Sequence, residues 1–187
     1  MHTLPIQELH ALRLAIFDNA EELHREADLL LKNCMYSRAY LLAHFCVEEL
    51  GKIPIVVGVI GKITEGEAVD WKKVKKRFTN HEAKIASQNG HFYTFGLEID
   101  LVTDQDIQWL LSANKAVPES YSKKNLSTYV DANNGKILRP SEAISEDEAT
   151  RLVKFAFECL RAHWRSEGLT NPIVYEANDE GKSINDA

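Results

Sequence analysis

Apolar side chains recur at steps of three and four residues along most of the chain, which places them on one face of an α-helix. The first run of this kind predicts a helix over residues 5–32. After a break at 33–37, a second run predicts an antiparallel helix that reaches Ile60, with a kink at Pro54 because proline removes a backbone donor. A third run predicts a helix over residues 71–88.

The second half of the chain begins with a shorter helical pattern and then changes to turn chemistry. Thr103 is a candidate N-cap for a helix that runs to Ala116 and stops at Pro118. Residues 119–143 contain several turn-forming stretches, among them an Asp-Ala-Asn-Asn-Gly run, and predict a long loop.

A last amphipathic helix is predicted to begin at a capping box formed by Ser145 and Glu148. We expect residues 1–168 to form one helical domain and the polar residues 169–187 to form a tail. No internal repeat and no convincing strand pair is visible. The predicted fold class is therefore all-α, a bundle of about four to five helices with a long loop before the last one.

Composition and charge narrow the function classes. The chain carries 22 basic and 28 acidic residues, a net charge of −6, so it has no broad positive field that would collect nucleic acid. Any contact with RNA or DNA must be a local patch. Hydrophobic residues make up 44% of the chain, which excludes wholesale disorder.

The sequence also bears on the compartment. Cys34, Cys46 and Cys159 are odd in number and form no CxxC pair, which favours buried thiols in a reducing cytosol over a disulfide or a zinc site. Residues 1–5 lack the regions of a signal peptide. The apolar stretch at 53–60 is far shorter than the roughly 20 residues of a membrane span. We therefore expect a cytoplasmic protein without membrane contact.

The densest polar cluster within an apolar pattern is the string from Glu48 to Lys52. Buried charges need partners, and Lys52 lies four residues after Glu48 and three after Glu49, so a local ion pair is available on the helix. The functional alternative is that Glu48, Glu49 or both face a pocket shared with the third predicted helix.

The third predicted helix supplies the complementary groups. His81 and Lys84 are one turn apart, Arg77 lies four residues before His81, and Lys76 belongs to the basic run that precedes them. Such groups could bind a phosphate, titrate near neutral pH and stabilise developing negative charge. The alternatives are a solvated basic face for the run and a core histidine for His81.

Two further sets of residues are candidates for function. His44 and Glu48 share a helical face and could bind a metal together with Glu49 and His81, but no ExxH pair recurs on a second helix, so we predict neither a metal nor a cofactor. In the predicted loop, Tyr129 could stack on a base or could simply anchor the loop on the bundle.

These strings together resemble a known family. The resemblance rests on the stretch from Ser37 to Ala43, the string Glu48-Glu49-Leu50-Gly51-Lys52, the pair His81-x-x-Lys84, and Lys124-x4-Tyr129-Val130-Asp131 with Gly135 and Pro140 downstream. The chain resembles the AbiV-type abortive infection family of prokaryotic phage-defence proteins, which belongs to the HEPN superfamily. The resemblance implies a helical bundle, a homodimer, and a role in halting an infected cell by cutting or binding RNA.

The residue chemistry described above and the resemblance together predict a site. Its catalytic residues would be Glu48, Glu49, Lys52, His81 and Lys84, and its RNA-binding residues Lys76, Arg77, Lys124 and Tyr129. HEPN ribonucleases carry an arginine and a histidine separated by four to six residues. Three residues separate Arg77 from His81, whereas five separate Arg38 from His44, which makes the latter an alternative catalytic pair.

Two functions follow from the sequence. The first is a metal-independent ribonuclease, or RNA-targeting toxin, in which histidine acts on the ribose 2′-hydroxyl. The second is a non-enzymatic effector that binds a protein of the phage or of the translation machinery, with the Glu, Lys and His residues forming a structural network.

Overall fold

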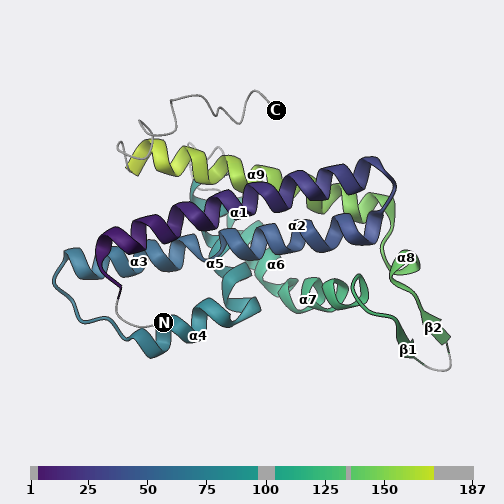
Figure 1. Ribbon diagram of the computed structural model, residues 1–187, viewed down its shortest axis with the longest axis horizontal. Helices are drawn as coiled ribbons and strands as arrows, with labels where there is room; N and C mark the ends of the chain where they lie inside the picture. The colour runs from purple at the N-terminus through teal and green to yellow at the C-terminus, as the bar shows by residue number, and fades with distance from the viewer. Residues whose placement is uncertain (1–3, 97–103, 134–135, 171–187) are drawn as a thin grey trace.

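The computed structural model describes residues 4–96, 104–133 and 136–170. Helices α1 (Ile6–Lys32) and α2 (Tyr36–Leu50) form the expected antiparallel hairpin, and α9 (Glu146–Thr170) lies alongside both (Figure 1). Their small facing residues, such as Ala20, Ala43 and Ala156, are fully buried and let the helices approach closely. Most of the buried core residues come from these three helices.

The second predicted helix is divided in two. Helix α2 ends at Leu50, and α3 (Ile53–Thr64) begins after a turn at Gly51 and Lys52. Pro54 does not kink a continuous helix. It lies in the first turn of α3, where a missing N–H removes no helical hydrogen bond.

The third predicted helix is also divided, at Asn80. Helix α4 (Trp71–Thr79) ends there and α5 (His81–Phe95) begins, because the Asn80 side chain accepts a hydrogen bond from the N–H of Ala83 at 2.7 Å and caps the new helix. The backbone of Asn80 is extended, with φ −86° and ψ 120°. Residues on opposite sides of Asn80 therefore do not share a helical face.

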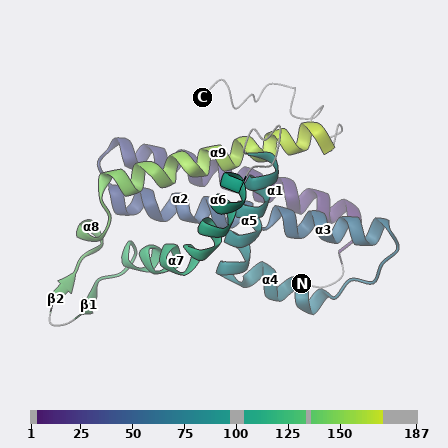
Figure 2. The same ribbon diagram turned by 180° about the vertical axis from the view of Figure 1, so that it is seen from behind.

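The prediction of a long loop over 119–143 is wrong. Helix α6 (Asp104–Lys115) is followed at once by α7 (Val117–Leu126), in whose first turn Pro118 is tolerated. The predicted N-cap Thr103 lies outside the described residues. Figure 2 shows α7 below α2.

A short hairpin and a short helix complete the segment, so the expectation of no strand pair is also wrong. Strands β1 (Asp131–Asn133) and β2 (Lys136–Leu138) pair antiparallel, with Ala132 opposite Ile137, and α8 (Pro140–Ala143) follows. Figures 1 and 2 show the hairpin extending away from the bundle.

The capping box before the last helix is confirmed. The N–H of Ser145 donates to Glu148 Oε2 at 2.9 Å, and the N–H of Glu148 donates to Ser145 Oγ at 3.3 Å. Helix α9 continues to Thr170, two residues past the predicted tail boundary. The all-α class is confirmed, with more helices than the four to five expected.

The cysteines behave differently from one another. Cys46 and Cys159 are buried as expected, but Cys34 is exposed in the turn between α1 and α2, where its φ of 58° reverses the chain. In the described part of the chain, no helix is both long and apolar enough to cross a membrane.

Candidate functional site

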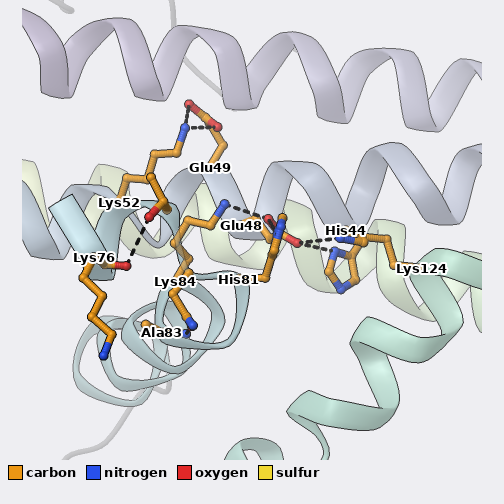
Figure 3. Close-up of polar contacts among 11 residues, drawn as sticks. His44, Glu48, Glu49, Lys52, Lys76, His81, Ala83, Lys84 and Lys124 are labelled. Atoms are coloured by element: carbon orange, nitrogen blue, oxygen red, sulfur yellow. Dashed lines mark hydrogen bonds and ion pairs between the residues drawn. The ribbon is translucent and has the colours of Figure 1, made fainter. Parts of the chain in front are cut away.

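One buried carboxylate gathers four basic side chains from three helices. Glu48 on α2 is 3% exposed, and its Oε2 accepts hydrogen bonds from His81 Nδ1 at 2.6 Å and Lys84 Nζ at 2.8 Å, both on α5. Its Oε1 lies 3.3 Å from His44 Nδ1 and 3.6 Å from Lys124 Nζ on α7 (Figure 3). These five residues form the Glu48 cluster.

The close approach of α5 to α2 depends on Gly51. A Cβ atom placed on Gly51 would lie 2.0 Å from the carbonyl oxygen of Lys84, which is backbone and cannot move aside. Only glycine therefore allows α5 to pass here. The glycine three residues after Glu48 is what lets Lys84 reach that carboxylate.

The Glu48 carboxyl stays ionised although it is buried. Burial by itself would raise the pKa of the Glu48 carboxyl, but contacts with His44, Lys84 and His81 outweigh it and hold the pKa well below its ordinary value. Glu48 is thus ionised at neutral pH. Two lysines against one carboxylate leave the cluster with a net positive charge, which suits an anionic ligand.

His81 forms the accessible edge of the Glu48 cluster. Its side chain is 43% exposed, whereas those of Lys84 and Lys124 are 9% and 8% exposed. The His81 ring lies against Tyr121 of α7 with ring centroids 5.2 Å apart, and Lys124 Nζ is 4.1 Å from the Tyr121 centroid.

Sequence reasoning missed Tyr121 because α7 was expected to be a loop. A signal for it was present. Pro118 near the start of a helix and the spacing of three between Tyr121 and Lys124 are together typical of one helical face. With α7 in place, Lys124, expected from the sequence among the RNA-binding residues, lies in the Glu48 cluster.

Glu49 and Lys52 pair with each other away from the Glu48 cluster. Lys52 Nζ lies 2.7 and 2.6 Å from the two carboxylate oxygens of Glu49 and 5.3 Å from the ring centre of Phe78 (Figure 3). Consecutive helical residues point about 100° apart, so the two glutamates face different neighbours. The local ion pair that the spacing allowed is the one that forms, but with Glu49 and not Glu48.

Lys76 and Arg77 are exposed on α4 and are not brought to His81. The break at Asn80 removes the shared face that the sequence predicted. Arg77 Nη2 instead lies 3.2 Å from the hydroxyl of Ser87, two turns into α5.

The alternative pair Arg38 and His44 is also separated. His44 is 1% exposed within the Glu48 cluster. Arg38 is exposed, and its Nη1 donates to the carbonyl oxygen of Ser127 at 3.2 Å, which ties the end of α7 to α2. Tyr129, further along, is 68% exposed and lies outside the cluster.

The metal arrangement weighed from the sequence does not assemble. It required His44, Glu48, Glu49 and His81 to converge, and Glu49 is held by Lys52. Among residues 4–96, 104–133 and 136–170, no group of three or more histidines, cysteines or carboxylates is placed to hold a metal ion.

Comparison with known proteins gives one match. A family model described as AbiV, of the HEPN type, matches residues 8–161, a range that contains every member of the Glu48 cluster. No curated protein and no solved structure matches the chain significantly.

Proposed function

Because the chain belongs to the AbiV family of HEPN proteins, which points to a role in abortive infection, we propose that it defends against phage as a metal-independent endoribonuclease. The observation that carries this proposal is the Glu48 cluster. It combines an oriented histidine at the surface with two lysines of positive charge directly beneath it.

The contact between Glu48 and His81 has the geometry of a base held by a carboxylate. An ionised carboxylate only accepts hydrogen bonds, so the hydrogen between them must be on His81 Nδ1. In the neutral form of the ring, His81 Nε2 then carries no hydrogen and can accept a proton. The same carboxylate stabilises the imidazolium that results.

The proposed reaction uses these groups in one displacement. His81 Nε2 takes the proton of a ribose 2′-hydroxyl, and the 2′-oxygen forms a bond to the adjacent phosphorus as the bond from phosphorus to the 5′-oxygen breaks. The leaving 5′-oxygen takes a proton from solvent. Lys84 and Lys124 stabilise the charge that builds on the phosphate. The products are a 2′,3′-cyclic phosphate and a 5′-hydroxyl.

Two copies of the chain would concentrate the positive charge that one copy lacks. The net charge of −6 disfavours RNA over most of the surface, so a homodimer that places two exposed His81 edges side by side would give the RNA a local positive track. We include this homodimer in the proposal.

A second candidate function is a non-enzymatic effector that binds a phage or translational protein. The burial of Lys84 and Lys124 favours it, because both lysines already pair with Glu48 and a network of that kind also stabilises a fold. The two functions differ in whether His81 performs chemistry.

The test is cleavage of end-labelled tRNA and total RNA by the purified protein, with and without EDTA. We expect discrete cleavage that survives EDTA, leaves 2′,3′-cyclic phosphate ends, and falls by at least about 100-fold in His81→Ala, the typical contribution of general acid–base catalysis. His10→Ala, which removes a histidine from α1 outside the Glu48 cluster, is the matched control and should cleave normally.

Other results would point elsewhere. Cleavage that EDTA abolishes would contradict the metal-independent mechanism. The absence of cleavage by the wild type, or equal cleavage by wild type and His81→Ala, would favour the effector function. The search would then turn to protein partners.

A further inference from the structure

A groove that contains no member of the Glu48 cluster is not used by the proposed reaction. It has a volume of about 650 Å³ and is formed by residues of α1, α3, α4, α5 and α9. Pockets that bind small molecules typically measure about 300–1,000 Å³. The groove is therefore large enough for a compact organic ligand.

Glycines keep two walls of the groove open. Gly58 on α3 and Gly90 on α5 both line it, and a Cβ atom on either would meet nothing within 4 Å. Glycine inside a helix costs about 1 kcal/mol relative to alanine, so packing within the described residues gives no reason for it here. Two side-chain-free walls suit a flat ligand that approaches the backbone closely.

The remaining walls combine apolar and polar side chains. Ile53, Val57 and Phe95 line the groove, and Val57 is 46% exposed on the outer surface of α3. Apolar walls with a few fixed polar groups are the usual composition of a small-molecule site. The body of the ligand is thus expected to be aromatic.

The polar groups give the groove a positive charge. Arg77 lines it next to Ser87 and has no carboxylate partner among the described residues. Arg13, 5% exposed, also lines it and pairs with Glu167 through Nη1, while its Nε and Nη2 have no hydrogen-bond partner. The Arg13 and Glu167 charges cancel, which leaves that of Arg77.

From this combination we infer that the groove binds a small aromatic anion. The ring lies between the glycine walls against Phe95, and a phosphate or carboxylate pairs with Arg77, whose guanidinium fork matches either group. Ser87, which donates its hydroxyl hydrogen to the carbonyl oxygen of Ala83 and accepts from Arg77, holds that guanidinium at the groove. This site is separate from the Glu48 cluster, so it stands whether or not the protein cleaves RNA.

The test is binding of naphthyl phosphate and naphthoate to the full-length protein by calorimetry, with inorganic phosphate and naphthol as partial ligands. We expect both complete ligands to bind at least about 10-fold more tightly than either partial one. Gly58→Phe fills the groove and should abolish binding. Gly61→Phe adds the same side chain to α3 outside the lining and should bind normally.

A second variant tests the charge. Arg77→Met keeps the length of the side chain and should weaken both anions at least about 10-fold while leaving naphthol unchanged. If Gly58→Phe does not fold by circular dichroism, Gly90→Leu blocks the other wall and replaces it.

Three outcomes would overturn the inference. Equal binding by wild type and Gly58→Phe would place the ligand elsewhere. Inorganic phosphate that binds as tightly as naphthyl phosphate would indicate a surface ion contact. Loss of a dimer in Gly58→Phe but not in Gly61→Phe, seen by light scattering, would show that a second copy covers the groove.

Discussion

Helix α5 contributes histidines to two clusters that differ in one respect. At its start, His81 bonds to the buried carboxylate of Glu48. Ten residues further along, His91 stacks on His163 of α9 with ring centroids 3.7 Å apart, and His163 Nε2 lies 2.8 Å from the neutral Gln88 Oε1. The first cluster has a buried anion at its centre and the second has a neutral amide.

The difference appears in the protonation states. Burial lowers the pKa of His91 to about 4 and that of His163 well below its ordinary value, so both rings are neutral at pH 7. The Glu48 carboxyl stays ionised because basic side chains surround it. Burial thus keeps the His91 and His163 rings uncharged, whereas the basic partners of Glu48 keep its carboxyl charged.

The largest effect is expected from removing the buried anion. Glu48→Gln leaves Lys84 and Lys124 buried without a counter-charge, which should lower the free energy of unfolding by about 3–5 kcal/mol in urea titrations. The control is Glu49→Gln, which breaks a more exposed pair and should cost about 1 kcal/mol or less. Equal losses would show that Glu48 is not the centre of its cluster.

Acidification should lower the stability of the protein through the cluster of His91 and His163. Unfolded histidine takes up a proton near pH 6.5, whereas His91 does so only near pH 4, so the unfolded state binds more protons between these values. Stability should therefore fall as pH drops from about 6.5 towards 4, by up to about 3 kcal/mol for His91. Thermal unfolding across pH 7.5 to 4.5 measures this.

The matched variant for the pH series is His91→Gln, which removes one titrating ring. It should flatten the dependence, while Glu48 contributes mainly at more acidic pH, because its contribution is lost only once the unfolded carboxyl begins to take up a proton near pH 4.5. A slope that is unchanged in His91→Gln would assign the pH dependence to other groups.

A smaller effect is expected where α5 crosses α2. Gly51→Ala forces a Cβ against the Lys84 backbone and should cost about 1–3 kcal/mol, together with loss of RNA cleavage, because Lys84 moves away from Glu48. Gly61→Ala, in open space on α3, should gain about 0.5–1 kcal/mol instead. Chemical denaturation of the two variants measures both changes. A loss in Gly51→Ala alone would show that the close contact between α2 and α5 requires glycine, and equal changes would show that it does not.

The smallest effect on stability is expected at the exposed edge of the Glu48 cluster. His81→Ala removes a ring that is 43% exposed and leaves Glu48 paired with Lys84, so it should cost about 1 kcal/mol or less in thermal unfolding. A loss as large as that of Glu48→Gln would mean that His81 is structural and would sharpen the case for the effector function.

Much of the fold followed from periodicity. The stripe on α1, its antiparallel partner and the capping box at Ser145 are local signals, and each was sufficient to place a helix. The breaks at Gly51 and Asn80 were missed because the apolar spacing runs through both. What ends these helices is a close contact at Gly51 and an extended backbone at Asn80, which periodicity does not record.

The candidate site could likewise be predicted only in part. Sequence spacing brought Glu48, His81 and Lys84 into one hypothesis but could not choose between Glu48 and Glu49, since the choice depends on the rotation of α2 about its axis. Tyr121 lay in a segment rich in turn-forming residues, so its helix was not recognised. Its place beside His81 depends on the packing of α7 against α2 and α5, which spacing along the chain does not record.

The chain reversal at Cys34 provides an attachment point for a spectroscopic probe. Cys34 is exposed, whereas Cys46 and Cys159 are buried, and burial raises the pKa of both buried thiols. A maleimide reagent should therefore modify Cys34 alone, without any substitution. With one spin label per chain at the end of the α1–α2 hairpin, the distance between the labels of two associated copies can be measured.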